Sequence, residues 1–376
     1  MCVFILIFNL LLISFMKYGK EILVGLMLLM INMLSAQSVT EKRSFMKSLP
    51  MGKDTRLEVK NKYGDVHFNL WNKDSVYILA EVEAFAPNHS KIQKMFDGIN
   101  INITGTSSLI RAETEFTREI TVLLESFKGL TEKIIDYDSR VQINYFVSVP
   151  EQIDINVENQ FGDVSMENNR GVVSVSLSNG DFKANSLNRL ADLTLNFGDA
   201  EIGSVRSGKI RTTFSKLVIS ESDELNINST STRFEMRKAG KITVESRRDK
   251  FFIGSVSELQ GVSYFTDYKI DNLEKGADLN LKYGSLDADG IDNNFEKINL
   301  VSAYSDITIS FDPSASYEFE IRHTNAFVVV PERNSKPEKE VLNEDKKEYL
   351  TSGKVGSNPG SRKVRIEASR GNIYLK

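Results

Sequence analysis

The chain has 376 residues, with 47 basic and 51 acidic side chains and a formal net charge of −4. This near balance gives no general positive field and disfavours a nucleic-acid partner. Cys2 is the only cysteine, so the chain offers no disulfide framework and no cysteine-based metal site or nucleophile. Seven prolines and 23 glycines favour a body of many short strands and turns over a helical bundle.

The first 36 residues contain two apolar bursts separated by MKYGKE. We interpret 16–36 as a signal peptide, in which Lys17 and Lys20 form the basic region and Ser35-Ala36 precede cleavage. Residues 1–15 then lie upstream of the true start at Met16. The alternative is an uncleaved membrane anchor. Export to the periplasm, the outer-membrane surface or the extracellular space follows, with membrane contact only through this segment.

Residues 37–79 are predicted to form a first coil, because LEVKNKYGDVHFNLW places a turn at Tyr63-Gly64-Asp65 between two alternating strands. Residues 80–150 interrupt this pattern. They contain the strand-like YILAEVEAF, a short helix predicted over Ser90 to Ile99, a strand pair and the alternating VQINYFVSV. We expect this insert to cap the open end of a stack, where strand edges need covering.

Residues 151–330 carry one pattern that returns every 17 or 18 residues, with a last step of 21. Its first apolar residue after each turn is Val164, Phe182, Ala200, Leu217, Phe234, Phe251, Tyr268, Leu286 or Ile307. Two positions further lies Met166, Ala184, Ile202, Ile219, Met236, Ile253, Ile270, Ala288 or Ile309. A fixed period with an inward-facing pair predicts an all-β fold, a single-stack β-solenoid with one coil per repeat.

The turns of these coils contain Gly162, Gly180, Gly198 and Gly284, where we expect a positive φ. Ser215, Arg233 and Lys250 replace the glycine or its neighbour in the middle coils.

Beyond residue 311 the pattern weakens, and Phe327 and Val329 are its next expected inward pair. Residues 331–363 are charged, lack periodicity and are predicted to be a flexible loop. The closing VRIEASRGNIYLK, residues 364–376, repeats the motif with Ile373 and Leu375 inward. We predict that it is the terminal coil, which finishes the stack.

The motifs NKYGDV, NQFGDV and NFGDA, the run from Val147 to Asn159 and the closing SRGNIYLK resemble the "putative adhesin" family of repetitive β-solenoid envelope proteins of the Bacteroidetes. The resemblance covers nearly the whole mature chain. It implies the solenoid fold and an adhesive role, and it provides no catalytic residues to carry over.

Two columns of charged turn residues are candidate sites. Asp163, Asp181 and Asp199 occupy equivalent positions in successive coils and are candidate Ca²⁺ ligands. The favoured alternative is that each carboxylate hydrogen-bonds turn backbone.

In the next three coils the column becomes Lys216, Arg233 and Lys250, with Arg248 close by. This stripe is a candidate site for an anionic polysaccharide or lipid head group. The alternative is a solvated edge that discourages aggregation.

The sequence favours a non-enzymatic, adhesin-like protein that presents a repetitive surface to a glycan or another envelope component. No motif implies a cofactor. Trp71, Tyr264, Phe265 and Tyr304 are candidates for a sugar-stacking surface, although strand aromatics are more often core. The alternatives are an envelope polysaccharide-active enzyme, which needs converging carboxylates, and a periplasmic scaffold or sensor.

Overall fold

The computed structural model describes residues 38–118, 120, 139–331 and 335–376. The segments 1–15 and 16–36, interpreted above as an upstream stretch and a signal peptide, lie outside the described residues. Among the residues that are described, no helix has the length and apolar character needed to cross a membrane.

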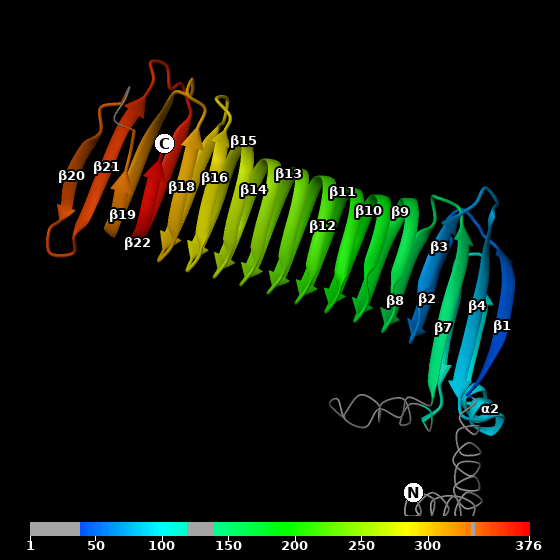
Figure 1. The fold of residues 1–376 in the computed structure, drawn as a ribbon. Coiled ribbons are helices and arrows are strands. Elements are labelled where there is room, and N and C mark those ends of the chain that lie inside the picture. The colour runs from blue at the N-terminus through cyan, green and yellow to red at the C-terminus, as the bar shows by residue number, and fades with distance from the viewer. Residues whose placement is uncertain (1–37, 119, 121–138, 332–334) are drawn as a thin grey trace, which may run out of the picture. The chain divides into compact units, whose positions relative to one another are not determined.

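The described elements are almost all strands (Figure 1). In chain order they are β1 (Val39–Pro50), β2 (Arg56–Lys62), β3 (Val66–Leu70), β4 (Ser75–Ala86), α2 (His89–Asp97), β5 (Ile99–Gly105), β6 (Leu109–Phe116), β7 (Arg140–Val149), β8 (Asp154–Gln160), β9 (Val164–Ser178), β10 (Phe182–Asn196), β11 (Asp199–Thr213), β12 (Lys216–Thr230), β13 (Arg233–Arg247), β14 (Lys250–Tyr264), β15 (Asp267–Lys282), β16 (Ser285–Ile291), β17 (Lys297–Ala303), β18 (Asp306–Phe311), β19 (Tyr317–Val329), β20 (Glu338–Asn343), β21 (Glu348–Val355) and β22 (Lys363–Leu375).

The chain divides into two compact units. The first comprises the described parts of Met1–Arg43, Val82–Asn100 and Phe116–Gln142. Its helix α2 confirms the predicted one: the Asn88 side chain caps the start by accepting from the Lys91 N–H at 2.9 Å. Ile92, Met95 and Phe96 form the buried apolar stripe, at the spacing of one helix face.

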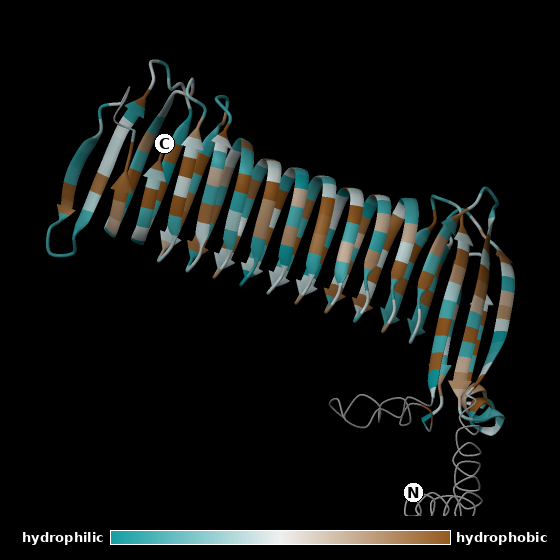
Figure 2. Ribbon diagram, viewed as in Figure 1, coloured by the Kyte–Doolittle hydropathy of each residue, from teal (hydrophilic) through white to brown (hydrophobic). Residues whose placement is uncertain are grey.

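The second unit, Ser44–Glu81, Ile101–Glu115 and Ile143–Lys376, contains the predicted β-solenoid of about nine turns. Strands β9 to β15 pair in parallel and in register, and Figure 1 shows them side by side. Both predicted inward columns are confirmed, since Val164 pairs with Phe182 and Met166 with Ala184, and the register continues from coil to coil. The alternation of apolar and polar residues along each strand is visible in Figure 2.

The turn glycines do not have the positive φ that the sequence led us to expect. The left-handed conformation falls on the preceding residue, Phe161, Asn179, Phe197 or Tyr283, with φ between 57° and 60°. Glycine is needed for another reason: a Cβ on Gly198 would lie 1.9 Å from the carbonyl oxygen of Gly180 in the adjacent coil, and the other turn glycines are similarly close.

In the middle coils the place of glycine is taken by Ser215, Thr232, Asp249 and Thr266. The last three make buried side-chain hydrogen bonds to adjacent coils. The Ser229 hydroxyl donates to the Asp249 carboxylate at 2.6 Å, which also accepts the Thr232 N–H at 2.7 Å. Burial raises the pKa of Asp249, while these hydrogen bonds lower it by less. Arg233 and Lys250 therefore occupy the positions of the turn aspartates, not of the glycines.

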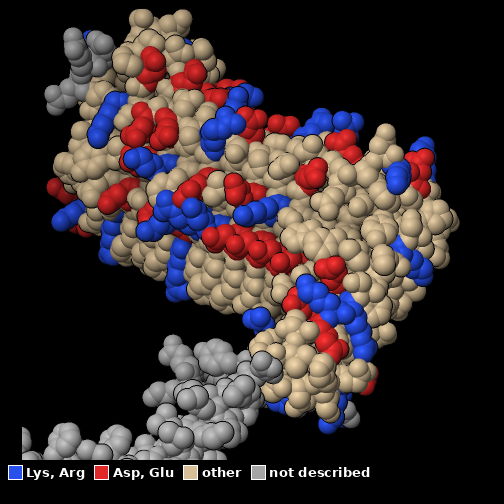
Figure 3. All heavy atoms as spheres, turned by 45° about the vertical axis from the view of Figure 1, so that its right-hand side comes forward, with Lys and Arg blue, Asp and Glu red and all other residues tan. Residues whose placement is uncertain are grey.

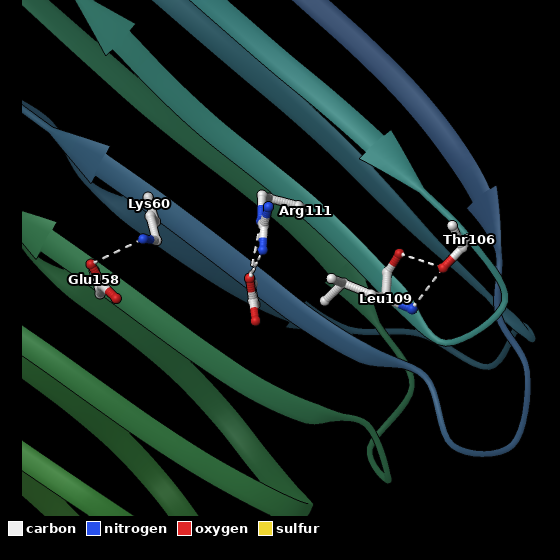
Figure 4. Close-up of polar contacts among 6 residues, drawn as sticks. Lys60, Thr106, Leu109, Arg111 and Glu158 are labelled. Carbon is white, nitrogen blue, oxygen red and sulfur yellow. Dashed lines mark hydrogen bonds and ion pairs between the residues drawn. The ribbon is translucent and has the colours of Figure 1, made fainter.

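At the start of the solenoid the inserted segment continues the stack. β2 lies between β8 and β6, and β3 lies between β9 and β7, all in parallel. Ion pairs bridge the outer faces of these strands, Lys60 to Glu158 at 3.6 Å and Arg111 to Glu58 at 2.8 Å (Figure 4). The segment predicted as a cap thus also contributes a layer of the solenoid.

The other end differs from the prediction in two respects. In the described part of 331–363, which was predicted to be a flexible loop, β20 and β21 form an antiparallel hairpin, and β21 also pairs with β19. Residues 364–376 do not finish the stack either, because β22 lies between β17 and β18 on one side and β19 on the other. Phe327 and Val329 are exposed, and their neighbour Val328 pairs with the inward Ile373.

Candidate functional site: a corner column of aromatic and basic residues

Each coil turns one corner through a residue in the left-handed conformation. These corner residues are Tyr63, Phe161, Asn179, Phe197, Phe214, Ser231, Arg248, Phe265, Tyr283, Tyr304, Arg370 and Asn325, with φ from 51° to 67°. The conformation is costly for residues other than glycine, by about 1–2 kcal/mol each. Hydrogen bonds between coils hold it: the N–H of Phe197 donates to the Thr213 carbonyl at 3.1 Å, and that of Arg248 to the Tyr264 carbonyl at 2.9 Å.

Because the backbone is the same at every corner, the side chains form one column on the outside of the second unit. Phe197 and Phe214 are 58% and 57% exposed, and Phe265, Tyr283 and Tyr304 are 40–47% exposed. The rings stack between adjacent coils, with centroids 5.4 Å apart for Phe197 and Phe214 and 4.9 Å apart for Phe265 and Tyr283. Exposed aromatic rows of this kind are unusual in a protein whose alternating strands bury most other aromatic side chains.

The corner column was not recognised from the sequence, although its signal is present. An aromatic residue stands three positions before most of the inward anchors, as in KYGDV, QFGDV and NFGDA. Of the four aromatics considered for sugar stacking, Phe265 and Tyr304 belong to this column, whereas Tyr264 and Trp71 do not.

The aromatic column is interrupted at Asn179 and, over two successive coils, at Ser231 and Arg248. Between Phe214 and Phe265 it contains Ser231 and Arg248, so neither ring has an aromatic neighbour on that side. Arg248 makes no side-chain hydrogen bond, ion pair or ring contact with the described residues. This break is the longest interruption of the aromatic column between Tyr63 and Tyr304.

The predicted basic stripe is also present as a column, since Lys216 pairs with Arg233 and Arg233 with Lys250 in register. Two of its members share one carboxylate, since that of Glu235 lies 3.3 Å from Lys216 and 2.7 Å from Arg233. The hydrogen bond from Arg233 is the main reason that the pKa of Glu235 is lowered. Lys250 has no ion pair within the described parts of the chain.

Three basic side chains without an ion pair in the described structure lie together on one coil. Arg247, Arg248 and Lys250 are all exposed on it, next to the exposed rings of Tyr264 and Phe265 on the following coil. Elsewhere both signs of charge are interspersed on the surface, as one face shows in Figure 3. We call the cluster of Arg247, Arg248, Lys250, Tyr264 and Phe265 the basic–aromatic cluster.

The predicted acidic column has a structural role that the geometry explains. The Asp181 N–H donates to the carboxylate of Asp163 at 2.8 Å, and the Asp199 N–H to that of Asp181 at 2.9 Å. Asp65 accepts from the Asp163 N–H in the same way at 2.8 Å. Each carboxylate thus serves backbone of the adjacent coil, not of its own turn. Among the described residues, no three His, Cys, Asp or Glu side chains are grouped as metal ligands; calcium binding stays a prediction.

A cavity of about 730 Å³ lies at the C-terminal end of the solenoid, over β19, β21 and β22. It is lined by both signs of charge, including Glu318, Glu320, Lys354 and Arg365. Glu318 is held by Lys354 at 2.7 Å, and the hydrogen bond from Lys354 lowers the pKa of Glu318. A carboxyl group that is held ionised cannot serve as a general acid near neutral pH.

No family model and no curated protein matches the chain. Among solved structures, one described as a "putative cell adhesion protein" from Clostridium sporogenes is 12% identical, with a TM-score of 0.18, over 89% of this chain and 100% of that one. A "putative lipid binding protein" from Parabacteroides distasonis is 11% identical, with a TM-score of 0.29, over 89% and 96%. A "putative adhesin" from the same organism is 10% identical, with a TM-score of 0.26, over 90% and 98%. Similarity at these values carries no argument about function.

Proposed function

We propose that this protein is an exported, non-enzymatic, adhesin-like β-solenoid that binds a polysaccharide of the cell envelope along its corner column. The observation that carries the proposal is the exposed, stacked aromatic column with its adjoining basic–aromatic cluster. A rigid stack holds these side chains at the spacing of neighbouring strands, so weak contacts with a repetitive polymer add up.

The chemistry of the cluster supports an anionic ligand. Arg247, Arg248 and Lys250 lie together and pair with no carboxylate of the described residues, whereas Lys216 and Arg233 share Glu235. Unpaired like charges repel one another unless solvent or a bound anion screens them. The rings beside them add apolar contact area, against which the C–H faces of sugar rings can pack.

The non-enzymatic part of the proposal rests on the carboxyl groups. Asp249, whose pKa is raised, is only 1% exposed and lies beneath the corner, out of reach of a polymer. Asp163 and Asp181 lie on the surface, but their carboxylates accept backbone N–H groups. An acid and a base that converge on an exposed bond are required for glycoside hydrolysis.

The test combines fractionation of a tagged protein with binding of the purified protein to immobilised polyuronate, sulfated and neutral polysaccharides and to anionic lipid vesicles. We expect an envelope or extracellular fraction and salt-sensitive binding to an anionic polysaccharide. The triple reversal of Arg247, Arg248 and Lys250 to glutamate should abolish binding, and reversal of Lys216 should have a small effect. Cytoplasmic retention, or binding to vesicles alone, would refute the proposal.

A further inference from the structure

We propose that the break in the corner column is a binding site for one carboxylate-bearing sugar ring, which takes the position of the missing aromatic ring at Ser231. This inference rests on the proposed function and deepens it, since it names the sugar class and the residues that bind it. Phe214 contributes a ring face on which the sugar packs, and Arg248 contributes the positive charge. Ser231 is small enough to leave room for the sugar ring.

The geometry of the column defines the space. From Phe214 to Phe265 the column advances three coils, about 14 Å at the ~4.8 Å spacing of paired strands. Where adjacent corners are both aromatic, the ring centroids lie 4.9–5.6 Å apart. Two ring positions are therefore unfilled. Arg248 is the corner residue at the second position. Ser231, whose hydroxymethyl group is far smaller than an aromatic ring, is the corner residue at the first.

The ring faces explain why a flat ligand binds at an interruption of the column and not between stacked rings. At the other interruption, Asn179, both neighbouring corner residues are phenylalanines, and only the break at Ser231 adjoins a cationic corner residue, Arg248. Inside a stacked pair, each ring turns its face to its neighbour, as Tyr283 does to Phe265 and to Tyr304 at 4.9 and 5.1 Å. Such rings offer solvent only their edges. Phe214 stacks on Phe197 alone, and its opposite face is directed along the column towards Ser231. A pyranose ring can pack its apolar C–H face there.

The charge at the break selects the anion. The Arg248 guanidinium has no partner in the described structure, and Arg247 and Lys250 add positive charge on the same coil. Asp267, the next residue of the Lys250 column, accepts from the Ser285 hydroxyl at 2.7 Å and forms no ion pair with Lys250 in the described structure. A guanidinium binds a carboxylate through two parallel hydrogen bonds, which fixes the orientation of the sugar as well as its charge.

The test uses titration calorimetry of the full chain with oligomers of polygalacturonate and with the same oligomers after methyl esterification. The informative variant is Ser231→Phe, which fills the break with a residue that the column already contains at Phe214 and Phe197. Ser231→Ala is its matched control, because it keeps the space. We expect Ser231→Phe and Arg248→Ala each to weaken polyuronate binding at least 10-fold, and Ser231→Ala to change it less than 2-fold. The unfolding midpoint of Ser231→Phe should be unchanged or higher.

The outcomes separate this site from the wider proposal. Binding of polyuronate that Ser231→Phe leaves intact would overturn the site at the break while leaving the adhesive function in place. Equal affinity for esterified oligomers would overturn the selection of the carboxylate. Failure of the protein to bind any polysaccharide in the panel above would overturn both. Loss of binding in Ser231→Phe, with a normal unfolding midpoint and a normal Ser231→Ala control, supports the site.

Discussion

Replacement of the corner residue Phe197 by alanine and by glycine measures which residue of the turn is left-handed. Both changes remove the ring that stacks on Phe214, so the difference between them reports the backbone alone. At φ 57° a Cβ costs about 1–2 kcal/mol, and glycine avoids this cost. We therefore expect Phe197→Gly to be the more stable variant by about 1 kcal/mol. In an ordinary extended strand the order would be the reverse, because glycine there costs about 0.5–1 kcal/mol relative to alanine.

The neighbouring glycine gives the complementary result. Gly198→Ala places a Cβ 1.9 Å from the Gly180 carbonyl oxygen, so the backbone of one coil must move away from the next. Overpacking of this kind costs about 1–3 kcal/mol. Ser231 allows the same comparison at a corner without a ring. As at position 197, the glycine variant should be more stable than the alanine variant.

The assay is equilibrium unfolding in urea, followed by far-ultraviolet circular dichroism, with the slope of the transition checked for each variant. A constant slope is needed because a stack of repeats can unfold in parts. If the alanine variants are as stable as the glycine variants at both 197 and 231, the assignment of the corner is refuted.

Three further results are expected. Asp249→Asn should remove a gain in stability at low pH. Burial raises the pKa of the Asp249 carboxyl above 3.8 in the folded state, so its protonation stabilises the fold as the pH falls through the folded pKa towards 3.8. Unfolding midpoints measured across this pH range should rise on acidification in the parent protein and not in the variant. Asp181→Ala should lower the free energy of unfolding by about 0.5–1.5 kcal/mol, since the Asp199 N–H loses its acceptor. Asp181→Asn should lower it less. Equal losses of the two variants in urea unfolding would contradict the hydrogen-bonding role. EDTA and Ca²⁺ should leave the thermal midpoint of the protein unchanged, whereas a rise of the midpoint with Ca²⁺ would favour the metal site.

The solenoid could be predicted because its determinants are local and repeated. An inward pair two residues apart follows from strand geometry, and each coil needs only the coil before and after it. The inward positions from Val164 to Ile309 are accordingly buried as expected. The short helix at 89–97 was also visible, since its apolar residues recur at helical spacing.

The turn could not be predicted correctly because its conformation depends on the adjacent coil. A Phe-Gly-Asp turn taken alone suggests that glycine is the left-handed residue. In the stack, the carbonyl oxygen of the adjacent coil is what requires glycine, and it lies 18 residues away, as for Gly198 and Gly180. The register of equivalent positions was nevertheless available from the sequence, and the aromatic corner column could have been found by comparing position with position.

The basic stripe was predicted as a candidate anion site, which stays a prediction. Its ion pairs could not be predicted, because ion pairing depends on the facing residues. Glu235 follows Arg233 by two positions, and its carboxylate also lies close to Lys216 on the preceding coil. Only the structure separates these paired cations from Arg248 and Lys250. The order of the last strands could not be predicted either. β22 pairs with β18 and β19, although the β20–β21 hairpin separates them in the sequence.

The position of β22 affects how this end of the protein is built during synthesis. β17 and β18 gain their next neighbour only when residues 363–376 have left the ribosome. β19 is made earlier, but it joins the solenoid only by pairing with β22. Coils up to β16 can add one by one as they emerge, but the last part must assemble out of order. Until it does, an apolar core and unpaired strand edges are open to another copy of the chain. Pairing of β22 with β17 and β18 therefore covers their open edges.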